Sequence, residues 1–236
     1  MLLLREEHAV EGAHEDAFEA TMRDEWLPAL ARGDDARLYY YLNLAHGSGL
    51  SYRVVTYSVI PDGAAWGRLV ERVAGGDLAA LSEKLDGLRH EVTAGLYISL
   101  PWSPMGELEL ADIPAEPVEH DLTLFMEDTV HPREGRLEEY VERAGAHYAV
   151  EFDEQRSKRP QLLEIQAAWR AAYGSQRRRE VILWQKVVRP EQIAGLLTRE
   201  VPARYKQPGL WMLDALEWRD QWQSRLLRTS SWSPGA

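Results

Sequence analysis

Two short motifs combine side chains that can move a proton or bind a metal. His8 and Glu11 stand three residues apart before a glycine, and His131 and Glu134 repeat that spacing. In the first turn of a helix, residues i and i+3 share a face, so each pair can act as a proton relay or supply two metal ligands. No third ligand stands nearby, and a glycine turn with an early acidic residue is also an ordinary way into a helix, which is the reading we favour. We therefore predict no metal site and keep His8 and His131 as candidate catalytic residues.

Polar side chains also recur at alternate positions of two strand-like runs, residues 37–44 and 162–170. Successive strand residues point to opposite faces, so the apolar members of each run, such as Leu38 and Leu163, are expected to pack under helices. The polar members then face an enclosed interior, where a carboxyl group has a raised pKa suited to proton abstraction. An open sheet with one wet face is the alternative. Glu164 is the candidate general base, and the candidate substrate-binding residues are Arg37, Tyr39, Tyr41, Asn43, Gln166 and Arg170.

Large aromatic side chains form two further patterns. Tyr57 and Trp184 take corresponding places in two apolar strand-like runs, where they either stack on a flat substrate or fill a core. Both are counted among the candidate substrate-binding residues. Trp211, Trp218 and Trp222 share one face of a predicted helix, and such a stripe usually belongs to a core or a subunit interface. The second pattern leaves a homodimer open.

The residues that carry these patterns belong to an internal repeat. The His-x-x-Glu-Gly sequence recurs 123 residues after His8, and the Trp-Ser-Pro that begins at Trp102 recurs 130 residues later at Trp232. Between them, the sequence around Gly47 recurs 127 residues later around Gly174. The matches keep their order while the spacing grows in small steps, as insertions in loops would produce. We interpret the two halves of the chain as copies of one unit.

Each copy shows the same order of predicted elements. A short apolar run is followed by a helical stretch, two strand-like runs around a Gly-Ser turn, a second helical region and a last short strand. The predicted fold class is α+β, with two tandem ferredoxin-like β-α-β-β-α-β units. The units are expected to span residues 1–104 and 121–236, joined by an acidic, proline-containing linker over 105–120. Their antiparallel sheets, pressed together, would close an intramolecular α/β barrel.

The duplicated order, together with the sequence His-Pro-Arg-Glu-Gly-Arg-Leu-Glu-Glu-Tyr at residues 131–140, resembles the dimeric α/β-barrel superfamily. Within it, the NIPSNAP-type domains are the most similar. The superfamily includes cofactor-free monooxygenases, cyclases and isomerases that act on aromatic or polyketide-like molecules, as well as haem enzymes. Its members share no catalytic motif, so the resemblance implies a small-molecule protein and assigns no residue.

Composition and charge limit the partners. The chain has 27 Lys and Arg against 38 Asp and Glu, a net charge of −11, and such a surface repels nucleic acid and anionic lipid. No apolar run reaches membrane-spanning length, and the apolar run at the start is too short for a secretory signal, so we expect a cytoplasmic protein. The absence of cysteine excludes thiolate chemistry. The expected partner is a small hydrophobic or aromatic molecule, with no cofactor, nucleic acid or membrane.

Three functions fit these observations. The first is a cofactor-independent enzyme of monooxygenase, cyclase or isomerase type, with an aromatic or polyketide-like substrate in the barrel cavity and Glu164, His8 or His131 moving a proton. The second is a non-catalytic small-molecule-binding protein with the same pocket. The third is a haem protein of the same fold, for which His147 is the internal candidate ligand.

Overall fold

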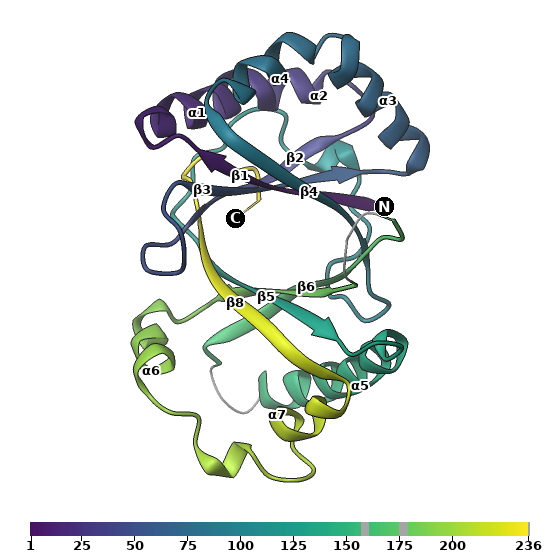
Figure 1. Cartoon of the computed structure of the whole chain (residues 1–236), viewed down its shortest axis with the longest axis vertical. Helices are drawn as coiled ribbons and strands as arrows, with labels where there is room; N and C mark the ends of the chain where they lie inside the picture. Colours follow the sequence, from purple (N-terminus) through teal and green to yellow (C-terminus); the bar gives the residue numbers. More distant parts are fainter. Residues whose placement is uncertain (157–160, 175–178, 236) are drawn as a thin grey trace.

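The computed structural model describes residues 1–156, 161–174 and 179–235, and its two halves have the same order of strands (Figure 1). The strands of the first half are β1 (Leu2–Val10), β2 (Arg37–Leu44), β3 (Arg53–Ile60) and β4 (Arg89–Ser99). Its helices are η1 (Gly12–His14), α1 (Glu15–Thr21), η2 (Met22–Trp26), α2 (Leu27–Ala31), α3 (Gly63–Gly75) and α4 (Ala79–Asp86). The strands of the second half are β5 (Leu124–Pro132), β6 (Leu163–Ala171), β7 (Val181–Val187) and β8 (Arg219–Thr229). Its helices are α5 (Leu137–Arg156), η4 (Pro190–Gln192), α6 (Ile193–Thr198), η5 (Ala203–Tyr205), α7 (Trp211–Asp214) and η6 (Ala215–Glu217).

The strands form one closed antiparallel barrel in the order β1-β3-β2-β8-β5-β7-β6-β4. Each half contributes four neighbouring strands, and the halves join where β2 pairs with β8 and where β4 pairs with β6. The helices of each half cover the outer face of its own strands, at opposite ends of the molecule (Figure 1). In this ring β1 and β5 lie opposite each other. The predicted fold, two ferredoxin-like units closing an intramolecular α/β barrel, is therefore confirmed.

A β-bulge interrupts the second strand of each half at the same place. The register of β2 against β3 shifts between Leu38 and Tyr40, and that of β6 against β7 shifts between Ile165 and Ala167. The extra residues are Tyr39 and Gln166, which lie 127 residues apart, as the repeat requires. An extra residue turns the following side chains to the other face. Strict alternation therefore fails beyond this point in both halves.

The last strand of each half is longer than the sequence pattern predicts. β8 begins at Arg219 and pairs with β5 over its whole length, with Trp222 opposite Val130. Trp211 lies in α7, while Trp222 is a strand residue with 44% of its surface exposed. The predicted helical stripe of Trp211, Trp218 and Trp222 is therefore wrong, because pairing with a neighbouring strand outweighs the apolar spacing.

The repeated Trp-Ser-Pro sequence ties each half to the other. Trp102, beyond β4, donates its indole N–H to the Val141 carbonyl of α5 at 2.8 Å, and Trp232, beyond β8, donates to the Glu19 carboxylate of α1 at 2.8 Å. The following serines accept backbone N–H groups of the opposite half, each at 3.0 Å, from Ala168 to Ser103 and from Tyr41 to Ser233. The segment that follows the last strand of each half therefore contacts the other half. These contacts add to the strand pairing of β2 with β8 and of β4 with β6.

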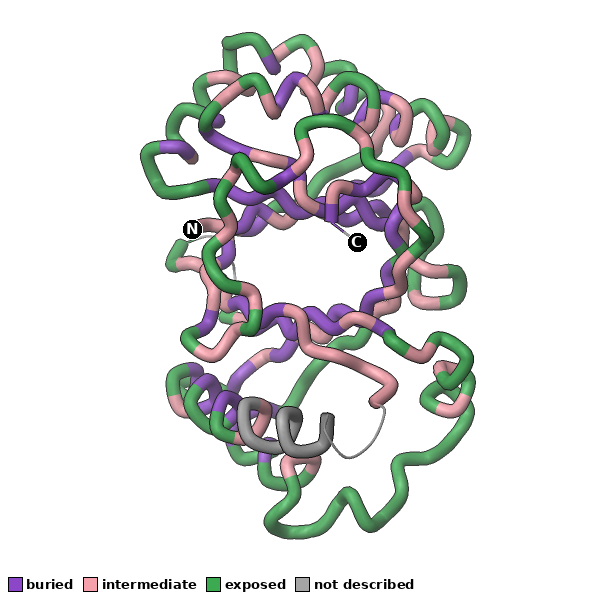
Figure 2. The backbone as a smooth tube through the Cα atoms, turned by 180° about the vertical axis from the view of Figure 1, so that it is seen from behind, coloured by how far each residue is buried: buried purple, intermediate pink, exposed green. Residues whose placement is uncertain are grey.

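The barrel interior holds its own apolar cluster, separate from the layers under the helices. Figure 2 shows buried backbone around much of the ring of strands and mostly exposed backbone in the outer turns. The segment that connects the halves adds to this cluster, because Ile113 is buried there and Leu108 and Leu110 pack against it. Leu110 begins a short 3-10 turn, η3 (Leu110–Asp112), beside Arg37 and Met1. The segment predicted as a linker thus also covers the end of the barrel where β1 begins.

Candidate functional site

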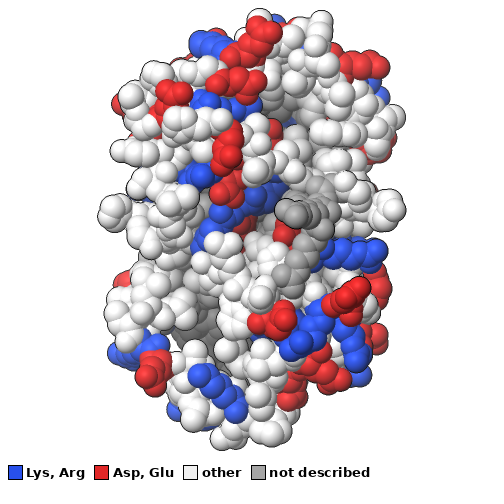
Figure 3. Space-filling view, in the orientation of Figure 1, with Lys and Arg blue, Asp and Glu red and all other residues white. Residues whose placement is uncertain are grey.

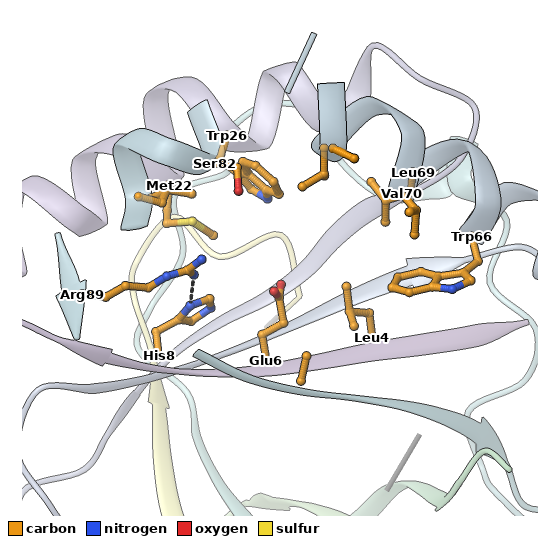
Figure 4. Close-up of a pocket in the computed structure, with 14 residues that line it drawn as sticks. Leu4, Glu6, His8, Met22, Trp26, Trp66, Leu69, Val70, Ser82 and Arg89 are labelled. Atoms are coloured by element: carbon orange, nitrogen blue, oxygen red, sulfur yellow. Dashed lines mark hydrogen bonds between the residues drawn. The ribbon is translucent and has the colours of Figure 1, made fainter. Parts of the chain in front are cut away.

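A cavity of about 270 Å³ lies between the sheet and the helices of the first half (Figure 4). Most of its wall is apolar and comes from β1, η2, α3 and α4. A few polar groups converge at one end, namely Glu6 and His8 of β1, Arg89 of β4 and Ser82 of α4. An apolar pocket with a few convergent polar groups is the usual form of a small-molecule site. We call it the helix-side cavity.

Local irregularity of the first helix shapes this wall. Between α1 and α2 the chain forms the π-helical turn η2, and its first and last residues, Met22 and Trp26, line the cavity. π-helical turns inside α-helices are rare and occur often at functional sites. Opposite them, α3 begins at the N-cap Asp62, whose carboxylate accepts the Ala65 N–H at 2.8 Å, and it turns Leu69 toward the cavity.

Glu6 projects from β1 into the cavity (Figure 4). Its neighbours on the strand, Arg5 and Glu7, point to the opposite face, into the barrel. Among the described residues no hydrogen-bond donor is placed on the Glu6 carboxylate. Burial raises the pKa of Glu6, while the charge of Arg89 acts in the opposite direction and that of Asp86 adds to the rise. Glu6 is therefore a more basic carboxylate than usual, half-buried and bordering an apolar space.

His8 and Arg89 form a chain of hydrogen bonds beside Glu6. Arg89 Nη1 lies 2.6 Å from His8 Nδ1, and His8 Nε2 lies 3.1 Å from Thr56 Oγ1. A guanidinium group only donates, so Nδ1 accepts and the proton of the neutral ring is on Nε2, facing Thr56. Burial and the charges of Arg89 and Arg5 lower the pKa of His8 to about 3. Asp86 accepts from Nε and Nη2 of Arg89 at 3.0 and 2.5 Å, which fixes the guanidinium group at the cavity end.

The second half has a carboxylate at the place equivalent to Glu6, but it is fully engaged. Asp128 follows Glu127 in β5 as Glu6 follows Arg5 in β1. Its carboxylate accepts from Gln185 at 2.8 Å and from Ser224 at 2.5 Å. Burial raises the pKa of Asp128 as well. The two halves therefore differ in one respect that bears on chemistry, because only the first-half carboxylate borders an apolar cavity without a hydrogen bond from the described residues.

The inner face of the barrel carries a charged network. Arg5 donates to both oxygens of Glu127, at 2.9 Å each, across the barrel from β1 to β5. Arg225 donates to Glu127 at 2.5 Å and to Glu7 at 2.8 Å, and the Tyr57 hydroxyl donates to Glu127. Burial alone would raise the pKa of Glu127, but the two guanidinium groups and these hydrogen bonds lower it to about 2. A carboxylate held this way is a poor base at neutral pH, so this network ties the halves together. In Figure 3, charged groups of both signs gather near the middle of the face viewed.

Aromatic rings fill the neighbouring part of the interior. Tyr57 and Trp184 are fully buried, and their ring centroids lie 5.3 Å apart. Trp184 stacks on Phe125 with ring centroids 4.6 Å apart. The ring centroid of Tyr40 lies 5.3 Å from that of Phe125 and 5.3 Å from that of Trp184. The equivalence of Tyr57 and Trp184 in the repeat agrees with the strand register, since they pair with Arg5 and Glu127. In the structure the two rings pack as core residues of the barrel interior. A role in stacking on a ligand stays a prediction.

The bulges redistribute the residues predicted to face the interior. Tyr41, Asn43 and Arg170 lie beyond the bulges and face the helix side, so their predicted orientation is wrong. Tyr41 packs against Trp232 in the first-half helix layer, Asn43 donates to Ser230 at 3.0 Å, and Arg170 donates to Glu138 of α5 at 2.7 Å.

The remaining members of that set keep to the inner side or to the bulge itself. Arg37 pairs with Val59 and Glu164 with Lys186, which places both on the inner face before the bulge. Tyr39 packs against the inner cluster. Gln166 is the extra residue of the second bulge. None of these residues lines the helix-side cavity, so their predicted roles in catalysis or substrate binding stay predictions.

The two histidines of the repeat also differ from expectation. His8 and His131 lie within β1 and β5, not in a helical turn, and they face opposite sides of the sheet. The strands align with a spacing of 122 residues, so His131 corresponds to Ala9 and not to His8. His131 Nδ1 lies 3.9 Å from a carboxylate oxygen of Glu180. Of the two, only His8 belongs to the cavity, where it holds Arg89.

Sequence reasoning missed Glu6 and Arg89. The apolar run predicted as the first strand covers only residues 2–4, whereas β1 extends to Val10 and includes Glu6. Arg89 had no signal either, since residues 64–93 were expected to belong to a helical region. Within the described part of the chain, no three His, Asp or Glu side chains are grouped so as to hold a metal ion, and no helix is long and apolar enough to cross a membrane.

No protein-family model matches the sequence, and no curated protein matches it. Solved structures share its architecture. One, from Lactobacillus acidophilus and named a "putative monooxygenase", has a TM-score of 0.57 at 8% identity, covering 100% of this chain and 97% of that one. An anthrone oxidase-like protein also has a TM-score of 0.57 at 8% identity, covering 97% and 91%. A NIPSNAP domain protein from Burkholderia xenovorans is 18% identical, with a TM-score of 0.35, and covers 41% of this chain and 91% of its own. The chain therefore has the dimeric α/β-barrel fold, which it shares with the first two of these structures.

Proposed function

We propose that this protein is a cofactor-independent enzyme for a small aromatic or polyketide-like substrate, which binds in the helix-side cavity with Glu6 as the general base. The observation that carries the proposal is the Glu6 carboxylate, which projects into a mostly apolar pocket and has no hydrogen bond from the described residues. A carboxylate of raised pKa that projects into an apolar pocket is the kind of group that exchanges a proton with a bound molecule. The monooxygenase, cyclase and isomerase types all begin with removal of a proton, which such a base performs.

The size and lining of the cavity support a compact, apolar ligand. Drug-sized ligands occupy about 300–1,000 Å³, so a space of about 270 Å³ suits a molecule of two or three fused rings at most. Trp26, Trp66 and Met22 supply aromatic and thioether surface for a flat molecule. The ligand is thus expected to present one acidic O–H or C–H group toward Glu6 and apolar surface elsewhere.

A non-catalytic binding protein is the second candidate, because the same cavity serves both functions. A haem protein has less support here. His8 is the histidine that lines the cavity, and its two ring nitrogens are engaged with Arg89 and Thr56. His147, the predicted alternative, stacks on Trp211 in the second half, with ring centroids 4.9 Å apart.

Conversion of a panel of small hydroxylated naphthalenes, followed by liquid chromatography and mass spectrometry, tests the proposal. Wild-type protein is expected to bind one ligand per chain and to convert at least one member of the panel. Glu6→Gln should abolish conversion, while Asp128→Asn, the matched change in the second half, should leave it intact. Binding without conversion by the wild type would favour the non-catalytic function. Conversion that survives Glu6→Gln would refute the role of Glu6.

A further inference from the structure

Arg89 and Glu6 together form a pair with opposite chemical capacities at one end of the helix-side cavity. Glu6 can accept a proton, and the guanidinium group can only donate hydrogen bonds. Arg89 has five N–H groups. Asp86 accepts one from Nε and one from Nη2, and His8 accepts one from Nη1. One N–H on each terminal nitrogen therefore has no partner among the residues that the structure describes. Figure 4 shows the guanidinium group above the His8 ring, with Glu6 on the side of His8 that faces Leu4.

The groups behind Arg89 hold it in this position. His8 accepts from Nη1 because its proton is committed to Thr56, and Asp86 accepts from the other edge of the guanidinium plane. The Arg89 side chain is 9% exposed, although its partner Asp86 is 60% exposed. A buried, fixed cation next to a base is the arrangement that stabilises an oxyanion as it forms, since no reorganisation is needed during the reaction.

We infer that the cavity catalyses enolisation of small apolar ketones, with Glu6 removing the α-proton and Arg89 stabilising the enolate oxygen. This inference rests on the proposed function and names its substrate class. In the step, Glu6 takes the proton from the carbon next to the carbonyl. The C–H electron pair forms the C=C bond, and the C=O π pair moves to the oxygen, which accepts N–H groups of Arg89. Return of the proton to the same carbon regenerates the ketone, and its delivery to another carbon isomerises the substrate, so no oxidant or cofactor is needed.

Deuterium exchange into 2-indanone measures this step directly. The ketone is incubated with the full-length protein in D₂O, and loss of the α-proton signal is followed by proton NMR against a protein-free sample. Wild-type protein is expected to accelerate the exchange, and Glu6→Gln to return it to the background rate. Arg89→Gln should lower the acceleration by about 10²–10³-fold, the usual effect of removing an oxyanion donor. Asp128→Asn should exchange at the wild-type rate.

Two further measurements keep the outcomes separate. Binding of 2-indanone by each variant, measured by isothermal titration calorimetry, shows whether a slow variant still forms the site. Arg89→Lys, which retains a positive charge, replaces Arg89→Gln in the test if that variant fails to fold. It is expected to recover part of the rate of deuterium exchange. Bound ketone without accelerated exchange in the wild type would overturn the inference while leaving the hydroxynaphthalene result, and thus the proposed function, unaffected. Unchanged exchange in Arg89→Gln and Arg89→Lys would overturn the role of Arg89 alone.

Discussion

Replacing Glu127 by Gln is expected to lower the free energy of unfolding by about 3.5 kcal/mol. The side chain of Glu127 has no exposed surface, and its carboxylate accepts from Arg5, Arg225 and Tyr57. Together these contacts lower the pKa of Glu127 from 4.5 to about 2. Each unit of such a shift corresponds to about 1.4 kcal/mol, which gives the estimate. It agrees with the 3–5 kcal/mol usually lost when one partner of a buried ion pair is removed.

The pH dependence gives the same prediction a second test. Because the pKa of Glu127 is lower in the folded state, its contribution is present above pH 4.5 and is lost as the pH falls toward 2. Urea unfolding, followed by tryptophan fluorescence at several pH values between 7 and 3, should therefore show a smaller acid-induced loss of stability in Glu127→Gln than in the wild type. The slope of the unfolding free energy against urea should stay the same, because the exposed surface does not change.

A double variant separates the cost of leaving a buried charge without its partner from the net contribution of the ion pair. Arg5→Met with Glu127→Met removes both partners and leaves Arg225 paired with Glu7 at 2.8 Å. Replacing a buried pair by apolar residues is often neutral or stabilising, so this variant should be clearly more stable than Glu127→Gln. A loss below about 1 kcal/mol in the single variant, or a double variant less stable than the single one, would refute the reasoning.

Two other predictions concern the seam between the halves and the cavity. Trp232→Ala should lower the free energy of unfolding by about 3–5 kcal/mol, because a buried ring and its hydrogen bond to Glu19 are lost, and urea unfolding checks this. His8→Gln should reduce the loss of stability between pH 6.5 and 3, since the pKa of His8 falls to about 3 on folding and protonation in that range favours the unfolded state. An acid-unfolding curve identical to that of the wild type would contradict the second prediction.

The fold could be predicted because repeated patterns report backbone pairing that both halves share. The order of elements and the equivalence of Tyr57 with Trp184 both follow from the repeat, and the strand register agrees with them. Side-chain orientation could not be predicted beyond Tyr39 and Gln166, because a bulge adds one residue without an obvious sequence signal. The lining of the cavity could not be predicted for another reason, since it depends on which face of β1 the helices cover and on where β4 begins.

Duplication within one chain explains why equivalent positions carry different chemistry. Arg5 and Glu127 occupy the same place in the two halves and face each other across the barrel. In a symmetric dimer of a single unit, that place would oppose two identical charges, which a buried interface does not tolerate. In this chain the two halves differ in sequence, so one position is an arginine, the other is a glutamate, and the two attract each other. The next residues diverged as well, because Asp128 gained hydrogen bonds from Gln185 and Ser224 while Glu6 has none from the described residues. One half thus stabilises its carboxylate internally, and in the other the carboxylate projects into the helix-side cavity, where the proposed function places the substrate.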